Sequence, residues 1–221
     1  MTKIKSIIFD YDGVFTRDDY TPVFNALNKS SHIDIEEISR IVSENERKLV
    51  ISPNSTQFLK DIKKIFRFPR TLEELTDLFN QRGDTYLYDE LPKFKRKGFH
   101  LSILSNQLAY RVPFVRNQLE TRFGLANFVK LYFSPEIRLQ KPFVGVYGDS
   151  SSSMDISKAD IFPLVVRDMK ELGYSPEECL FIDDSLANIT SASRYKINGM
   201  VFKNVIQMKE ILAKDYRIVL D

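Results

Sequence analysis

Two aspartates stand directly after an apolar run near the start of the chain, with one residue between them. The run is Ile7 to Phe9, and Asp10 and Asp12 follow it. A short apolar run with β-branched members is typical of a buried strand, and Gly13 lets the backbone turn after it. Side chains alternate along a strand, so residues two apart start on the same side. Two neighbouring carboxylates repel each other, and a divalent cation is a common remedy. Aspartate and glycine are also ordinary turn residues, so this pair alone is equally consistent with a simple strand end.

Polar groups follow three later apolar runs in a similar way. Ser105 and Asn106 come after a run at 101–104, Lys141 comes a few residues after a run at 130–133, and Asp183 and Asp184 come after a run at 179–182. Each of these segments alone reads as a helix cap or a solvated loop. The carboxyl ends of parallel strands meet at one edge of a sheet, so their joint occurrence predicts a site there.

The residue types at these strand ends suit phosphate chemistry. Three or four carboxylates would hold Mg²⁺, which prefers oxygen ligands and usually keeps some water. A lysine and a hydroxyl opposite the metal would hold an anion, helped by helix N-termini and loop amides. An aspartate aimed at a bound phosphoryl group can act as a nucleophile and form an acyl phosphate. The metal would then stabilise the charge that develops in the transition state.

The elements between these runs divide the chain into two parts. Residues 17–85 show three apolar stripes at helical spacing and no strand pattern. Asp34 with Glu37 and Thr71 with Glu74 resemble capping boxes, and Gly83 is a plausible helix stop. We therefore expect an independent helical subdomain over 17–85, inserted after the first strand.

The rest of the chain alternates strands with helices. Strands are expected at 7–9, 101–104, 130–133, 179–182 and 200–202, with helices at 87–97, from Pro113 to near Gly124, and at 161–172. This alternation predicts a Rossmann-like α/β core, residues 1–16 and 86–221, built on a parallel sheet of about five strands.

Composition narrows the class of protein. The chain has 221 residues, 43% hydrophobic and 28% charged, and a net charge of +2, which argues against nucleic-acid or membrane partners. The basic, aromatic stretch at 63–70 and the lysines at 93–97 resemble nucleic-acid patches, but acidic residues nearby favour a solvated face. We see no signal peptide and no membrane-spanning run, so a cytoplasmic location is expected. The single cysteine, Cys179, excludes an intramolecular disulfide and a cysteine-based zinc site.

These segments together resemble the four motifs of the haloacid dehalogenase-like (HAD) hydrolase superfamily. The matching stretches are Phe9-Asp10-Tyr11-Asp12-Gly13-Val14, Leu104-Ser105-Asn106, Lys141-Pro142 and Phe181-Ile182-Asp183-Asp184 followed by Asn188. The helical insertion is similar to the C1 cap of that superfamily. The details resemble the branch that contains glucose-1-phosphatase and the N-terminal phosphatase domain of epoxide hydrolase.

The resemblance implies a role for each motif residue. Asp10 would be the nucleophile, and Asp12 the general acid and base. Mg²⁺ would be held by Asp10, the backbone carbonyl of Asp12 and Asp184, with Asp183 adjacent; which of the last two contacts the metal directly is left open. The phosphoryl group would be held by Ser105, Asn106 and Lys141. The implied activity is a Mg²⁺-dependent phosphatase acting on a small phosphate monoester.

Several alternatives stay open at this point. A phosphomutase similar to β-phosphoglucomutase shares the Asp-Gly-Val stretch, and a non-catalytic binding protein would keep the fold. A dehalogenase would lack the second aspartate, and a phosphonate hydrolase would need a cap lysine that the sequence does not identify. Residues 143–158 form an insertion after Lys141-Pro142 that departs from the family pattern. Oligomeric state is left open.

Overall fold

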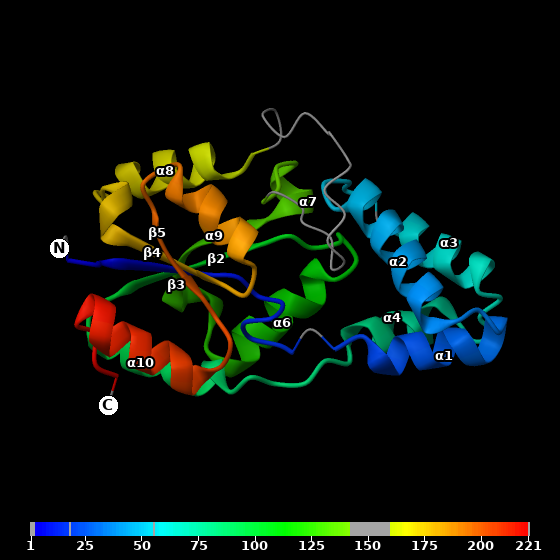
Figure 1. Ribbon diagram of the computed structural model, residues 1–221. Helices are drawn as coiled ribbons and strands as arrows, with labels where there is room; N and C mark the ends of the chain where they lie inside the picture. Colours follow the sequence, from blue (N-terminus) through cyan, green and yellow to red (C-terminus); the bar gives the residue numbers. More distant parts are fainter. Residues whose placement is uncertain (1–2, 18, 55, 142–159, 221) are drawn as a thin grey trace.

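A five-stranded sheet lies at the centre of the larger part of the molecule, and four helices form a second layer beside it (Figure 1). The structure, a computed structural model, describes residues 3–17, 19–54, 56–141 and 160–220. The strands are β1 (Ser6–Phe9), β2 (His100–Ser105), β3 (Phe128–Phe133), β4 (Cys179–Asp183) and β5 (Asn198–Val201). All pairs are parallel, in the order β3-β2-β1-β4-β5. The predicted parallel α/β sheet is confirmed.

Helices cover both faces of this sheet, which is why its strands read as continuous apolar runs. The core helices are α5 (Leu91–Arg96), α6 (Val112–Arg122), α7 (Ser134–Ile137), α8 (Phe162–Glu171), α9 (Leu186–Ser193) and α10 (Val205–Tyr216), with 3₁₀ turns η1 (Leu87–Glu90), η2 (Leu125–Asn127) and η4 (Pro176–Glu178). Ile7 and Phe9 pack with α5, α6 and α10. Ile8, pointing to the opposite face, packs with α8 and α9. β1 is thereby buried on both sides in the middle of the sheet.

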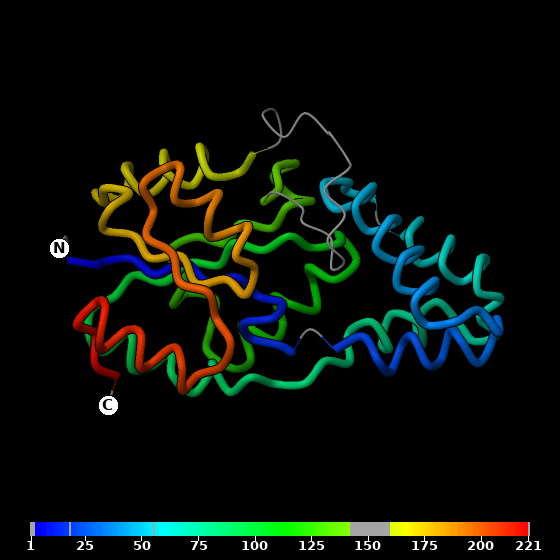
Figure 2. The backbone as a smooth tube through the Cα atoms, viewed as in Figure 1, coloured from blue at the N-terminus to red at the C-terminus, as the bar shows by residue number. Residues whose placement is uncertain are grey.

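The four remaining helices surround an apolar cluster of their own. They are α1 (Thr21–Ser31), α2 (Ile35–Leu49), α3 (Thr56–Ile65) and α4 (Leu72–Asn80). Phe58 lies in this cluster and stacks on Tyr110, with ring centroids 5.9 Å apart. Leu108 joins the same cluster. Because Leu108 and Tyr110 follow β2, the helical layer is packed against a loop that leaves the sheet edge (Figure 2).

The predicted helix ends are partly correct. Thr71 and Glu74 form a reciprocal capping box at the start of α4. Asp34 caps α2 by accepting from the backbone N–H groups of Glu36 and Glu37. The prediction that Gly83 stops a helix is wrong, because α4 ends at Asn80 with Gln81 as its C-cap.

Two chain passages join the helical layer to the sheet, and they are hydrogen-bonded to each other. Arg17 N donates to Gly83 O at 2.7 Å, and Thr85 N donates to Phe15 O at 3.3 Å. Thr16 and Asp84 form an antiparallel bridge between these bonds. The entry and the exit of the helical layer therefore run as one short ribbon.

Other boundaries differ from the sequence prediction. The helix expected over 87–97 is a 3₁₀ turn followed by α5, and the last strand starts two residues earlier than expected, at Asn198. The insertion at 143–158 lies outside the described residues. Across the described ranges, no helix combines the length and the apolar character needed to cross a membrane.

Candidate functional site

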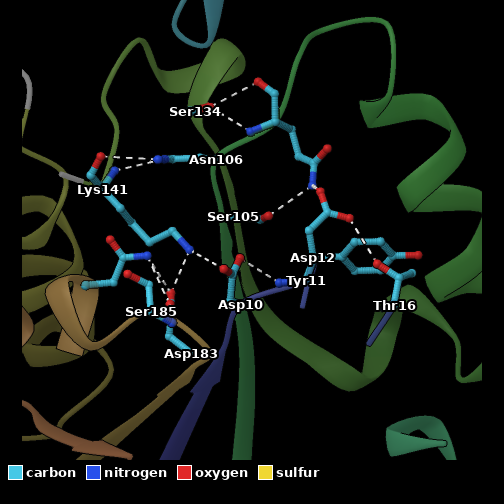
Figure 3. Close-up of polar contacts among 12 residues, drawn as sticks. Asp10, Tyr11, Asp12, Thr16, Ser105, Asn106, Ser134, Lys141, Asp183 and Ser185 are labelled. Atoms are coloured by element: carbon cyan, nitrogen blue, oxygen red, sulfur yellow. Dashed lines mark hydrogen bonds and ion pairs between the residues drawn. The ribbon is translucent and has the colours of Figure 1, made fainter. Parts of the chain in front are cut away.

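Lys141 lies at the centre of a buried group of charges at the carboxyl edge of the sheet (Figure 3). Its Nζ is 2.5 Å from Asp10 Oδ2 and 2.7 Å from Asp183 Oδ2. Asp10 follows β1, and Asp183 is the last residue of β4, which pairs with β1. Lys141 is only 1% exposed and Asp183 is fully buried. Asp10 and Asp183 are 173 positions apart in the chain, and they meet because β1 and β4 are neighbours in the sheet.

Hydrogen bonds from neighbouring residues fix each member of this group. Asp10 Oδ1 accepts from Tyr11 N at 2.6 Å. Asp183 accepts from Ser185 N at 2.8 Å and from Asn188 Nδ2 at 3.0 Å. These bonds satisfy the buried carboxyl groups and hold their orientation.

Asn106 sets the position of the lysine from the other side. Its Nδ2 donates to Lys141 O at 3.1 Å, and its Oδ1 accepts from Lys141 N at 2.8 Å. This paired contact ties the loop that carries Lys141 to the end of β2. The side chain of Asn106, expected to hold phosphate, is here engaged with the Lys141 backbone.

The protonation preferences in this group follow from burial and charge. Burial raises the pKa of Asp10 well above its usual range, and the nearby Asp183 and Asp184 add to the effect, while Lys141 opposes it. Burial opposes the charge on Lys141, but Asp10 and Asp183 outweigh it and raise the pKa of the ammonium. The two neighbouring carboxyl groups therefore favour the charged form of Lys141.

Three carboxylates in this group could hold a metal ion. Oxygen atoms of Asp10, Asp183 and Asp184 all lie within 4.8 Å of one another, and Asp184 is the exposed member. Gly13 leaves the space that Asp184 occupies: a Cβ there would be 2.1 Å from Asp184 Oδ2. Gly13 also has φ +77°, a conformation that disfavours other residues. The backbone turn after β1 and the position of Asp184 thus depend on the same glycine.

Asp12 points away from this group, and its Oδ1 accepts from Thr16 Oγ1 at 3.0 Å (Figure 3). Both oxygens of its carboxylate contact Arg111, at 2.7 and 3.1 Å. Arg82 Nη1 is 3.2 Å from Asp12 Oδ1, and Gln107 Nε2 donates to Oδ2 at 2.7 Å. Burial acts to raise the pKa of Asp12, but Arg111 and Arg82 outweigh it and hold that pKa below its usual range.

Gln107 links Ser105 to Asp12. Its Nε2 donates to Ser105 Oγ at 3.1 Å and to Asp12 Oδ2 at 2.7 Å. Gln107 N donates to Ser134 Oγ at 2.9 Å, and Ser134 Oγ donates to Val50 O, at the end of α2, at 2.8 Å. The end of α2 therefore contacts α7, and Ser134 of α7 also holds the loop after β2.

The sequence singled out the residues at the strand ends, and the structure brings Asp10, Asp183, Asp184 and Lys141 together. The sequence reasoning did not identify Arg82 or Arg111 as part of the site. Arg111 is the N-cap residue of α6 and Arg82 follows α4. No local pattern pairs residues that are 70 or 99 positions from Asp12. Gln107, two residues after Ser105, could have been found by its place beside that motif.

The fold of this chain is similar to those of several solved structures. An HAD family enzyme from Bacteroides thetaiotaomicron, BT-2542, solved with magnesium and inorganic phosphate, superimposes with a TM-score of 0.68 at 24% identity, covering 91% of this chain and 96% of that one. The chain has the fold of the HAD superfamily. The fold implied by the sequence motifs is thereby confirmed.

Two further structures share this HAD fold. A predicted HAD-like hydrolase from Porphyromonas gingivalis gives a TM-score of 0.64 at 21% identity, over 96% of this chain and 100% of that chain. An L-2-haloacid dehalogenase from Xanthobacter autotrophicus, with chloropropionic acid covalently bound, gives 0.56 at 14% identity, over 96% and 83%. No protein-family model matches the sequence, and no curated protein matches it.

Proposed function

We propose that this protein is a Mg²⁺-dependent phosphatase that hydrolyses a small phosphate monoester through an aspartyl-phosphate intermediate. The observation that carries the proposal is the buried group in which Lys141 lies between Asp10 and Asp183, with Asp184 beside them. The HAD fold and the magnesium and phosphate bound by BT-2542 support it.

The residues fit a divalent cation by charge and by chemistry. Asp10, Asp183 and Asp184 bring three carboxyl groups within 4.8 Å of one another, and the Lys141 ammonium lies beside Asp10. Carboxylate oxygens are the ligands that Mg²⁺ prefers. When bound, the cation would favour ionised carboxylates and neutralise charge on a phosphoryl group. The backbone carbonyl of Asp12 is proposed as a further ligand.

Asp10 is proposed as the nucleophile. Its Oδ1 is oriented by Tyr11 N and its Oδ2 by Lys141. A carboxylate oxygen attacks phosphorus, the bond to the leaving oxygen breaks, and the leaving alkoxide takes a proton. Water then attacks phosphorus, which releases inorganic phosphate and restores the Asp10 carboxylate.

Lys141, Ser105 and Asn106 are proposed to hold the phosphoryl oxygens, and Asp12 to transfer the protons. Lys141 is already ordered at the point where the nucleophile sits, so little reorganisation is needed when the substrate arrives. Asp12 would give a proton to the leaving oxygen and later take one from water, a contribution worth roughly 10²- to 10⁴-fold. In the structure Asp12 is held by two arginines, and it has to leave them to do so.

The helical layer, residues 17–85, is proposed to act as a cap that covers this site and contacts the leaving group. Its support is the contact of Val50 O with Ser134 Oγ and the packing of Phe58 on Tyr110, both next to the loop after β2. A small phosphorylated compound is the proposed partner, and a cytoplasmic location stays a prediction.

Phosphate release from a panel of monoesters, with Mg²⁺ and with a chelator, tests the activity. We expect release only with Mg²⁺. The Asp10→Asn variant should lose release while staying folded by circular dichroism, because an amide is a poor nucleophile of similar shape. Full release in metal-free buffer, or a variant that keeps a tenth of the wild-type kcat, would refute the assignment. Absence of release from every ester with a folded wild-type protein would favour a non-catalytic binding role.

A further inference from the structure

Two buried guanidinium groups lie beside Asp12 at the edge of the proposed active site. The side chain of Arg111 is 4% exposed and that of Arg82 is 2% exposed. Arg111 comes from the core, at the start of α6, and its Nε also contacts Asn80 Oδ1 at 3.4 Å. Arg82 comes from the passage that leaves the helical layer, and it lies 4.2 Å from the ring of Tyr20 in the other passage. The two cations thus meet where the core and the helical layer join.

The carboxylate between these arginines is more accessible than they are. The side chain of Asp12 is 21% exposed, so a small solute can reach its position. Arg111 donates to both oxygens of the Asp12 carboxylate. Removing the carboxylate would take this bidentate partner from a buried guanidinium group, which is costly in a protein interior. The position therefore favours an anion at all times.

The proposed chemistry requires Asp12 to leave this position. Arg111 occupies both of its oxygens, and the side chain points away from Asp10. A carboxyl group that transfers protons at the phosphoryl group must turn toward it, within hydrogen-bonding reach. Another anion then has to replace Asp12 on Arg111.

The distance to the proposed phosphate position limits what that anion can be. Gln107 Nε2 contacts both Asp12 Oδ2 and Ser105 Oγ, at 2.7 and 3.1 Å. Both contacts are made by one nitrogen, so the two oxygens lie within about 6 Å of each other. An anionic group two or three carbon atoms from the phosphate oxygen spans such a distance.

We propose that the substrate carries a second anionic group, a carboxylate or a second phosphate, that displaces Asp12 from Arg111 and Arg82. This inference rests on the proposed phosphatase function and names its substrate class. The planar fork of a guanidinium binds either kind of anion through two parallel hydrogen bonds. Binding of the correct substrate releases Asp12 to act as acid and base, so an ester without the second anion leaves Asp12 engaged.

Four short esters that differ in one substituent test the inference on the wild-type protein. They are carboxymethyl phosphate, ethanediol bisphosphate, 2-hydroxyethyl phosphate and 2-aminoethyl phosphate. We expect kcat/KM for carboxymethyl phosphate or ethanediol bisphosphate, which carry a second anionic group, to exceed that of the hydroxyethyl ester by roughly tenfold to hundredfold, the range of a charge-assisted contact. The carboxylate and bisphosphate arms distinguish the two anion sources. Equal kcat/KM for the hydroxyethyl ester and for both esters with a second anionic group would overturn the inference and leave the phosphatase function standing.

Binding to the Asp10→Asn variant separates this inference from the proposed activity. Calorimetric titration of carboxymethyl phosphate, ethanediol bisphosphate and 2-hydroxyethyl phosphate into that variant, with Mg²⁺, needs no turnover. We expect at least one anionic ester to bind roughly tenfold or more tightly than the hydroxyethyl ester. Tighter binding without any wild-type phosphate release would sink the phosphatase function but keep the second anion site. Equal dissociation constants would overturn the anion site.

Matched arginine variants identify the residues responsible. Arg111→Lys and Arg82→Lys keep the charge but remove the fork, and we expect the preference for the anionic ester to fall about tenfold in each. Arg116→Lys is the control, because Arg116 is 36% exposed on the same helix as Arg111 and pairs with Glu136 at 2.8 Å. It should keep the wild-type preference. A preference unchanged in Arg111→Lys and Arg82→Lys, with all proteins folded by circular dichroism, would contradict the assignment.

Discussion

Replacing Lys141 with methionine should destabilise the protein strongly in the absence of metal. Lys141 is 1% exposed and lies 2.5 Å from Asp10 and 2.7 Å from Asp183. Methionine fills a similar volume, so the loss comes from charge rather than from a cavity. Removing one partner of a buried ion pair costs about 3–5 kcal/mol of unfolding free energy. For a chain of this length, that predicts a fall in Tm of roughly 6–20 °C.

The assay is thermal unfolding at neutral pH, with a chelator and then with Mg²⁺. Mg²⁺ should raise the Tm of Lys141→Met more than that of the wild type, since the cation replaces the missing ammonium beside the carboxylates. Lys130→Met is the control, because Lys130 is 37% exposed and lies 3.3 Å from Asp168. Asp168 is buried but keeps Tyr132 and Arg167 as hydrogen-bond donors, so loss of the exposed ammonium should cost about 0–1 kcal/mol. Equal falls in Tm for the two variants in chelator would refute the reasoning.

Three further predictions follow from described contacts. Asp12→Ala should keep Mg²⁺ binding and accumulate phosphorylated Asp10 with an activated aryl phosphate, because water lacks its base; mass spectrometry after rapid quench should show one added phosphoryl group, and its absence would argue against the acid–base role. Gly13→Ala should lower both Tm and Mg²⁺ affinity by calorimetry, since a Cβ there would lie 2.1 Å from Asp184 Oδ2; unchanged Mg²⁺ affinity would contradict this. Burial raises the pKa of the Cys179 thiol to about 12. The contribution of the protonated thiol to the free energy of unfolding is therefore complete below about pH 9 and is lost as the pH rises toward 12. At pH 8, iodoacetamide should modify Cys179 only after unfolding, and labelling of the native protein at the unfolded rate would show an accessible thiolate.

The sheet could be predicted from the sequence because its strands are buried on both faces. A continuous apolar run such as 179–182 has few other interpretations, and β4 covers the same residues and one more.

Two helices with short apolar stripes were not predicted individually. α1 buries only Val23 and Leu27, and α10 buries only Met208 and Leu212, so neither gives a strong periodic signal.

The part of the candidate site that lies at strand ends could be anticipated in the same way. Parallel strands bring their carboxyl ends together, so Asp10 and Asp183 have to be neighbours once β1 pairs with β4. The position of Arg82 depends instead on how the helical layer sits on the core. Such contacts between distant segments leave no periodic trace in a single sequence, and the contact of Asp12 with Arg82 could not be foreseen.

The ribbon formed by the two connecting passages restricts how the helical layer can move. Arg17 to Gly83 and Thr85 to Phe15 are backbone hydrogen bonds, and a bridge joins Thr16 to Asp84. A two-stranded ribbon bends across its face far more easily than its strands slide past each other, because sliding breaks every bond at once. Bending of this ribbon is therefore the displacement of the helical layer that keeps these bonds. Asp12 accepts from Thr16 Oγ1 at 3.0 Å, so a bend at Thr16 moves a hydrogen-bond donor of the carboxylate.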